Sequence, residues 1–212
     1  MSKKLKKTKI TDIFGYVVGY ECKKKEIKII KSEKKIVDKI IIKNHYSKKP
    51  CKNSCYSLLV YYKNIISGAL QIGYGIKPKN KGKYDYKEVR EFDRMWLNDT
   101  MPKYSETITI SLLHKYIKNI NKDIKYLISY CDTSVGNKGT IYKASNYKLI
   151  DQLKADFYIL ENGERVHPIT MWHRHKTRAW EFLTKEYKGI KKAKGLQLKF
   201  IFKLRRWYLL VL

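Results

Sequence analysis

The stretch that decides the fold reads Tyr126-Leu127-Ile128-Ser129-Tyr130-Cys131-Asp132, a largely apolar run that ends on a carboxylate. Its first six residues are typical of a buried β-strand, since an apolar run this short favours a strand over a helix. A polar turn follows to Gly136, and residues 139–146 predict a short helix or tight loop before another strand. A carboxylate at a strand end, with two glycines and a tyrosine behind it, indicates a site on the edge of a scaffold.

Charge points to the class of partner. The 212 residues include 47 lysines and arginines against 19 acidic residues, which gives a formal net charge of +28. Such an excess attracts polyanions, so nucleic acid is the leading candidate. Translation of an AT-rich genome also enriches lysine, isoleucine and tyrosine, but that drift does not by itself remove acids. A membrane surface is less favoured, because no stretch combines length with a strong apolar face.

The four cysteines bear on compartment and metal binding. No apolar N-terminal segment resembles a signal peptide, so we expect an intracellular, cytoplasmic protein with free thiols. Cys51-x-x-x-Cys55 with His45 nearby could be half of a zinc site, but no second ligand pair follows, and we expect no metal. The apolar tail at residues 207–212 is too short to span a bilayer.

The first half of the chain alternates strands and helices. A basic N-terminal segment, residues 1–31, contains possible strands at 16–20 and 27–30, and a helix then runs from Ser32, as its N-cap, to Asn44. The next expected elements are β-rich runs at 56–62 and 65–74 joined by a two-residue turn, a basic loop at 77–86, a strand at 88–97, and a long helix from Tyr104-Ser105 to Ile120.

The second half continues the alternation. Residues 156–160 and 165–170 flank Glu161-Asn162-Gly163 as a hairpin, residues 172–187 are helical, and residues 198–204 form the last strand. Residues 188–212 thus contain a basic loop, that strand and the apolar tail. This order predicts a single α/β domain over residues 1–212 with a largely antiparallel sheet.

The order of elements resembles the GNAT acyltransferase fold, a mixed, mostly antiparallel sheet with helices on both faces and two splayed parallel strands that admit an acyl donor. The splayed strands would be residues 88–97 and 126–131. GNAT proteins usually hold the CoA pyrophosphate on a glycine-containing turn before the long helix, where this chain has residues 101–107 without glycine. The donor therefore stays open between acetyl-CoA and another activated small-group donor.

Five blocks, in the same order and at similar spacing, resemble the Mom family of bacteriophage DNA-modification proteins. They are His45-Tyr46-Ser47, Phe92-Asp93-Arg94-Met95-Trp96-Leu97, Tyr130-Cys131-Asp132, residues 139–147 and residues 163–167. The resemblance implies transfer of a carbamoylmethyl group to the N6 amine of adenine in double-stranded DNA, which shields phage DNA from restriction in the bacterial host cell. The family usually has Asn-x-x-Ser at the start of the long helix, where this chain has Tyr104-Ser105-Glu106-Thr107.

Four residues are candidates for the chemistry. The N6 lone pair is delocalised into the adenine ring, so the amine needs a positioned base and an activated electrophile. Asp132 is the first candidate for base or amine-orienting group, although it could simply cap its turn. His45 offers a second base, Tyr46 a hydroxyl, and Arg94 a guanidinium that must find a donor anion or a neighbouring acid.

Five further residues are candidates for substrate binding. Ser47 adds a hydroxyl beside His45, Tyr142 could stack on a flipped base, and Asn146 could hydrogen-bond an adenine edge. Lys143 would face a nucleotide, and His167 belongs to a matched block. Tyr142 and Asn146 could equally be packing and helix-capping residues.

Basic stretches at residues 77–87, 173–178 and 188–194 could converge on a phosphate backbone. Two other functions fit the composition. One is a GNAT-like N-acetyltransferase acting on a protein, a transfer RNA or a small amine. The other is a basic nucleic-acid-binding protein with no enzymatic activity.

Overall fold

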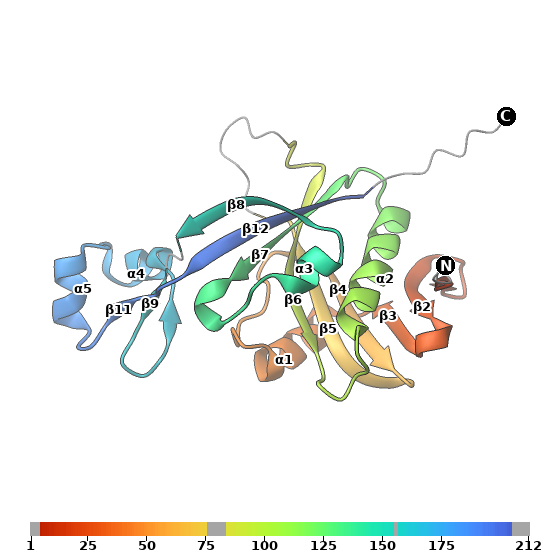
Figure 1. Ribbon diagram of the computed structural model, residues 1–212, viewed down its shortest axis with the longest axis horizontal. Coiled ribbons are helices and arrows are strands. Elements are labelled where there is room, and N and C mark those ends of the chain that lie inside the picture. Colours follow the sequence, from red (N-terminus) through yellow and green to blue (C-terminus); the bar gives the residue numbers. More distant parts are fainter. Residues whose placement is uncertain (1–4, 76–83, 155–156, 205–212) are drawn as a thin grey trace. The chain divides into compact units, whose positions relative to one another are not determined.

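The computed structural model describes residues 5–75, 84–154 and 157–204 (Figure 1). The chain divides into two compact units, each described by itself below. Unit 1 comprises Met1–Ser129, Ile141–Leu149 and Phe200–Leu212, and unit 2 comprises Tyr130–Thr140 and Ile150–Lys199. The single domain over residues 1–212 stays a prediction.

The main sheet is mixed, with strand order β1-β2-β3-β4-β5-β6-β7-β12-β8. Neighbouring strands from β1 to β6 pair antiparallel, and β6 pairs parallel with β7. The α/β, mostly antiparallel architecture is therefore confirmed. Strand β1 was not predicted, because the sequence analysis placed the possible strands of the basic segment at 16–20 and 27–30. The strands are β1 (Thr8–Thr11), β2 (Val17–Cys22), β3 (Ile27–Lys31), β4 (Ser54–Tyr62), β5 (Ile65–Gly73), β6 (Val89–Leu97), β7 (Tyr126–Asp132), β8 (Lys148–Lys154) and β12 (Leu196–Lys203).

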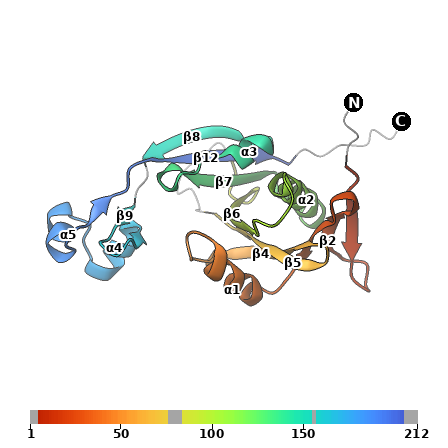
Figure 2. The same ribbon diagram turned by 60° about the horizontal axis from the view of Figure 1, so that its bottom comes forward.

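Helices α1 (Lys34–Asn44) and α2 (Ser105–Ile120) cover opposite faces of the sheet in unit 1 (Figure 2). Leu59 of β4 packs against Val37 and Ile41 of α1. Because side chains alternate across a strand, its buried neighbours Leu58 and Val60 point to the other face. The prediction of helices on both faces is confirmed.

The N-cap of α1 differs from the prediction. Glu33 holds that position, without a side-chain cap hydrogen bond. The backbone N–H of Ser32 instead donates to the carbonyl oxygen of Ser57 at 3.0 Å. Strand pairing with β4 thus continues through Ser32, which is why the helix starts later than its hydroxyl suggested.

The predicted two-residue hairpin between β4 and β5 is confirmed. Lys63 and Asn64 have φ of 47° and 65°, the positive values that a primed turn requires. This turn aligns a long ladder from Tyr62–Ile65 to Ser54–Gly73. The ladder places β5 in the middle of the sheet, next to the strand that carries Arg94.

The parallel pair β6 and β7 makes only a short ladder in unit 1. Its pairs run from Val89 with Tyr126 to Glu91 with Ile128. At the next step the hydroxyl of Ser129 donates to the Phe92 carbonyl oxygen at 2.8 Å. The ladder with β5 shifts register between Phe92 and Arg94, so Asp93 is the extra residue of a bulge. Asp93 therefore has no partner in the ladder between β5 and β6.

Helix α2 is more buried than an amphipathic surface helix. Its buried apolar residues Ile108, Leu112, Leu113, Tyr116 and Ile117 recur at helical spacing along one stripe. Outside that stripe, Ile110 and His114 are also buried. His114 Nε2 lies 3.0 Å from the Tyr147 hydroxyl, and its ring stacks on Phe202 with centroids 3.7 Å apart. A titratable ring thus sits in the core of unit 1.

The stability of the protein should fall as pH drops below 6.5. Burial, followed by the charges of Lys7 and Lys118, lowers the pKa of His114 from 6.5 to about 3. Below pH 6.5 His114 is protonated in the unfolded chain but stays neutral in the folded chain. The contribution of His114 to the free energy of unfolding is therefore intact above pH 6.5 and is lost between pH 6.5 and 3. From pH 7 to 5.5 it should lower the free energy of unfolding by about 1 kcal/mol.

Urea unfolding at both pH values measures this loss. His45 titrates in the same direction, so the comparison is with a His114→Phe/Tyr147→Phe variant, which keeps the stacked ring and removes both ends of the hydrogen bond. The variant should lose about 1 kcal/mol less than the wild type over that interval. Equal losses in the two proteins would contradict the assignment to His114.

Unit 2 has a small sheet of order β10-β9-β11 and a core of its own. Tyr158, Val166, Met171, Leu183 and Ile190 form that core. The elements are η2 (Thr133–Val135), β9 (Tyr158–Ile159), β10 (Arg165–Val166), α4 (Pro168–His175), α5 (Trp180–Glu186) and β11 (Lys191–Lys192), while η1 (Lys23–Lys25) lies in unit 1 and α3 (Thr140–Ala144) begins at the unit boundary.

Three predictions in unit 2 were wrong in part. The strand at 165–170 ends at Val166, because His167 caps α4 and Pro168 occupies its first turn. The helix at 172–187 is two helices, since Lys176 adopts φ 55° and ends α4. The basic loop at 188–195 contains β11. The hairpin of β9 and β10 around Gly163 is confirmed.

Some predictions fall outside the described residues. They are most of the basic loop at 77–86 and the apolar tail at 207–212. Within the described residues, no helix is both long enough and apolar enough to cross a bilayer.

Candidate active site

The loop after α1 orders the first block of predicted residues. The backbone N–H of Ser47 donates to His45 Nδ1 at 3.1 Å, and Ser47 Oγ lies 2.8 Å from the same nitrogen. Because Nδ1 accepts a backbone hydrogen bond, the neutral ring carries its proton on Nε2. Burial, helped by the charges of Arg94 and Lys48, lowers the pKa of His45 to about 4. At neutral pH His45 is thus a hydrogen-bond donor through Nε2.

Tyr46 is the exposed member of this block. Its side chain is 57% accessible, and its ring lies against that of His45 with centroids 4.3 Å apart. The two rings are tilted by 34° relative to each other, and Tyr46 is the exposed ring of the pair at the end of α1. This placement suits contact with a substrate better than a role in the core.

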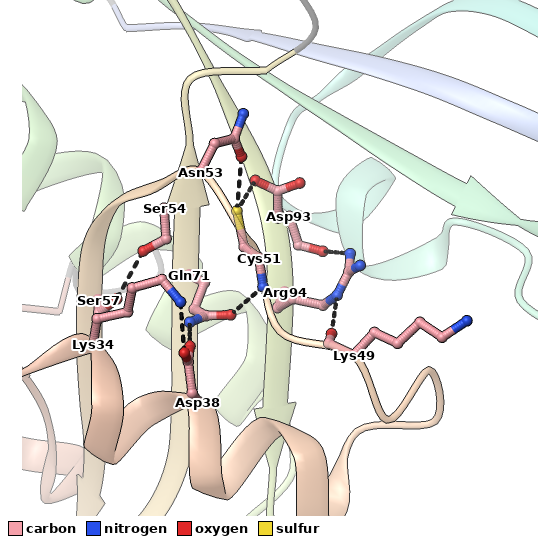
Figure 3. Close-up of polar contacts among 10 residues, drawn as sticks. All are labelled: Lys34, Asp38, Lys49, Cys51, Asn53, Ser54, Ser57, Gln71, Asp93 and Arg94. Atoms are coloured by element: carbon pink, nitrogen blue, oxygen red, sulfur yellow. Dashed lines mark hydrogen bonds and ion pairs between the residues drawn. The ribbon is translucent and has the colours of Figure 1, made fainter. Parts of the chain in front are cut away.

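Arg94 fastens the same loop to β6 (Figure 3). Its Nε donates to the Lys49 carbonyl oxygen at 2.9 Å, and its Nη1 donates to the Asp93 carbonyl oxygen at 2.8 Å. Nη2 makes no hydrogen bond to the described residues. The predicted alternative, an ion pair with the Asp93 carboxylate, does not occur, because that carboxylate faces a thiol. Arg94 therefore keeps donor capacity for an anion.

That thiol belongs to Cys51, which the sequence did not single out as a site residue. Its Sγ donates to Asp93 Oδ2 at 3.0 Å, and its backbone N–H donates to Gln71 Oε1 at 2.8 Å. Gln71 in turn donates to Asp38 of α1 at 2.5 Å (Figure 3). Burial and the neighbouring Asp93 raise the pKa of the thiol, so it stays protonated. The network fixes the loop between α1 and β6.

The start of α2 is where a GNAT protein would hold a CoA pyrophosphate. Tyr104 adopts φ 71°, the left-handed conformation that glycine favours. The Ser105 amide, however, already donates to the Pro102 carbonyl oxygen at 3.1 Å, and Glu106 places a carboxylate in the first turn. A used amide and a like charge oppose phosphate binding, so this turn as it stands does not fit a pyrophosphate.

Tyr142, Lys143 and Asn146, which the sequence proposed as nucleotide contacts, lie on or just after α3. For Tyr142 and Asn146 the structure shows the alternative roles of packing and capping. The ring of Tyr142 packs against Phe92, Tyr147 and Phe200, which is the packing role. Asn146 is exposed and has φ 63°, just past the end of α3, which is the capping role. Lys143 is exposed. Substrate contacts by these residues stay predictions.

Asp132 is at the centre of a hydrogen-bonded cluster inside unit 2. Its Oδ1 accepts from the Ser134 backbone N–H at 2.8 Å and from the Ser134 hydroxyl. Its Oδ2 forms an ion pair with Arg165 Nη2, which also donates to Ser134 Oγ at 2.7 Å. The side chain of Asp132 is only 11% exposed. The turn-capping alternative is therefore present, and the carboxylate is oriented by its neighbours.

His167 also lies in unit 2. Its Nδ1 accepts from the Ile169 N–H at 3.1 Å as the N-cap of α4, and its ring meets Phe157 edge to face. Asp132 and His167 thus share unit 2, while the other seven candidates, His45, Tyr46, Ser47, Arg94, Tyr142, Lys143 and Asn146, belong to unit 1. Sequence reasoning missed Arg165 and Cys51, although Arg165 stands within a matched block.

The cysteines behave as the sequence predicted. All four are free thiols. Cys51 and Cys55 point to different acceptors, Asp93 and the Ile72 carbonyl oxygen. Among the described ranges, no group of three or more His, Cys, Asp or Glu side chains is arranged to hold a metal ion.

Known proteins resemble this chain in fold and in sequence. Solved acetyltransferases share the fold: a ribosomal L7/L12 alpha-N-protein acetyltransferase has a TM-score of 0.51 at 9% identity, over 86% of this chain and 96% of that one. The GNAT fold predicted from the order of elements is confirmed.

Sequence comparison is more specific. The methylcarbamoylase Mom of Escherichia phage Mu is 34% identical over 175 residues, which cover 80% of this chain and 71% of that protein. The family model described as the Mom protein family matches residues 26–208. This range contains all five blocks and every candidate site residue, so the resemblance found in the sequence is confirmed: the chain belongs to the Mom protein family.

Proposed function

We propose that this protein is a DNA-modifying transferase that adds a carbamoylmethyl group to the N6 amine of adenine in phage or prophage DNA, in the cytoplasm of the bacterial host, and so protects that DNA from restriction. The observation that carries the proposal is family membership over most of the chain, with a methylcarbamoylase as a relative. The GNAT fold supports group transfer, and the net charge of +28 supports a nucleic-acid substrate.

The groups of unit 1 suit the electrophile. A donor that carries a carboxylate or another anion can accept hydrogen bonds from Nη2 of Arg94, which the loop contacts hold in a fixed direction. The N6 amine forms a bond to the methylene carbon of the donor as the bond from that carbon to the leaving group breaks. His45, neutral and protonated on Nε2, can donate a hydrogen bond to the leaving group as it takes that electron pair. The donor is left as an activated small-group compound, because the turn before α2 does not fit a pyrophosphate.

The N6 amine, as the nucleophile, needs to be oriented and to lose a proton. Asp132, held by Ser134 and Arg165, is proposed to orient the N6 amine or take its proton, since a weak nucleophile gains most from positioning and from a base. A duplex adenine must leave the base stack to reach any such group, so we infer a flipped base with Tyr46, Tyr142 and Asn146 as contacts.

Co-expression with plasmid DNA tests the proposal. The DNA is digested to nucleosides and analysed by mass spectrometry, and a fraction of deoxyadenosine is expected to carry the mass of a carbamoylmethyl group. A matched strain that expresses the His45→Ala variant at the same soluble level should give at least about 100-fold less product. An unmodified deoxyadenosine pool with soluble wild-type protein would refute the proposal, and acetylated protein or transfer RNA would favour an N-acetyltransferase.

A further inference from the structure

The turn between β1 and β2 exposes three large apolar side chains next to one another. Ile13 is 92% exposed, Phe14 is 78% exposed and Tyr16 is 72% exposed. Single exposed apolar residues are common on soluble proteins, but contiguous ones mark surfaces that contact a partner. These three side chains lie at the tip of a hairpin, which we call the 13–16 tip.

The 13–16 tip is an ordered turn. The carboxylate of Asp12 accepts from the backbone N–H of Phe14 at 3.0 Å and from that of Tyr16 at 2.9 Å. Asp12 and Tyr16 are also joined through their backbones at 3.0 Å, and Gly15 supplies the positive φ of 81° that closes the turn. The apolar side chains are thus presented by a hydrogen-bonded turn, and the Asp12 carboxylate accepts from the amides of that turn.

The surroundings of the tip select its partner. The first 31 residues contain ten lysines and three acidic residues. Lys9 is exposed on β1, which leads to the tip, and Lys6 is exposed just before that strand. The lysines beside the tip would repel another basic surface, such as a second copy of this chain. They would attract a polyanion, and the apolar side chains of the tip could bind such a partner if its interior is apolar. Duplex DNA, with phosphates outside and stacked bases within, has both properties.

We propose that the 13–16 tip is a wedge that enters the base stack of duplex DNA, with Phe14 as the inserted ring, and helps to open the helix around a target adenine. The proposal rests on duplex DNA being the substrate. It goes beyond family membership, because the family match begins at residue 26 and leaves the tip outside. Proteins that kink or open a duplex insert apolar side chains between base steps in this way.

The full chain is tested with duplexes that carry 2-aminopurine in place of one adenine, placed in each flanking-base context. The fluorescence of this base rises when it leaves the stack. Wild-type protein at saturation is expected to raise the signal, and Phe14→Ala should reduce that rise at least about fivefold because one stacking partner is lost. The dependence of affinity on salt should stay the same, since Phe14 contacts no phosphate.

Ile65→Ala is the matched control, because Ile65 is 70% exposed beside the turn of a different hairpin, β4–β5. It should leave the fluorescence rise within about twofold of wild type. A Phe14→Ala variant that unstacks the base as well as wild type would overturn the wedge. So would sedimentation that finds wild-type dimers without DNA and monomers of Phe14→Ala, because the tip would then contact a second copy.

The two proposals fail in different ways. If the wild type modifies plasmid adenine and Phe14→Ala matches it in both modification and fluorescence, only the wedge is refuted. If the wild type binds the duplex and unstacks the base but modifies no adenine, only the proposed chemistry is refuted. Absence of duplex binding by the wild type would refute both.

Discussion

Replacing Arg94 with alanine is expected to lower the yield of modified adenine by at least about 100-fold. The guanidinium joins the loop after α1 to β6 through the Lys49 and Asp93 carbonyl oxygens and leaves Nη2 for the donor. Alanine removes all of these donors at once. The loop that carries His45, Tyr46 and Ser47 then loses one of its attachments to the sheet and keeps the one through Cys51, and the electrophile loses its anion contact.

Arg94→Lys separates charge from geometry. Lysine keeps the positive charge, but a single ammonium cannot reproduce the planar fork that reaches two carbonyl oxygens and an anion. We expect Arg94→Lys to lose most of the activity, within about tenfold of Arg94→Ala. The measurement is the modified deoxyadenosine fraction after co-expression, with soluble protein quantified in parallel.

Arg90→Ala is the control from the same strand. The Arg90 guanidinium bonds the carbonyl oxygens of Tyr86, Lys87 and Val89 and lies over the Tyr74 ring, so its loss removes an arginine of β6 without touching the His45 loop. It should retain modification within about threefold of wild type, as expected of a substitution outside the site. An Arg94→Ala protein as active as Arg90→Ala would contradict the assigned role.

The fold was largely predictable because its main signals are local. The Lys63-Asn64 turn, the apolar run of β7 and the stripe of α2 each lie within a few neighbouring residues. The predictions were wrong where contacts with residues far away in the sequence determine the secondary structure. Ser32 continues the pairing with β4 because Ser57 lies opposite it, and residues 168–170 become helical although they had been read as strand. The core of unit 2 combines residues as far apart as Tyr158 and Ile190, which no short window contains.

The candidate site was predictable in its residues and not in their partners. His45 and Ser47 are two residues apart, and their contact follows from the sequence. The Cys51 thiol meets Asp93 across 42 positions, and Asp132 meets Arg165 across 33. One signal was available: Asp93 and Arg94 are consecutive polar residues between the apolar Phe92 and Met95, a break in alternation that is typical of a bulge.

Replacing Arg165 with alanine is expected to lower the free energy of unfolding by about 2 kcal/mol. Removing one partner of a buried ion pair leaves the other charge uncompensated, which costs about 3–5 kcal/mol when both are fully buried. The side chains of Asp132 and Arg165 are 11% and 26% exposed, so solvent screens the pair in part and we expect a cost below that range, about 2 kcal/mol. Asp132→Asn should cost about 1 kcal/mol, because the amide oxygen still accepts from the Ser134 N–H.

The double variant Asp132→Asn/Arg165→Met removes both charges and should recover at least half of the loss seen with Arg165→Ala. Urea unfolding followed by tryptophan fluorescence measures these differences, since Trp180 packs against the core of unit 2. A double variant that is no more stable than Arg165→Ala would mean that the ion pair does not hold the turn.

The same double variant separates structure from chemistry. If Asp132 orients or deprotonates the N6 amine, the variant should be stable yet form at least about 100-fold less modified adenine than wild type. Asp151→Asn is the matched control, because Asp151 is an exposed carboxylate of unit 2 that, within the described part of the chain, accepts a hydrogen bond from the adjacent Gln152 amide alone. It should keep wild-type yield. Full modification by the double variant would mean that Asp132 only caps its turn. The N6 proton would then be accepted by water or by another group of the site.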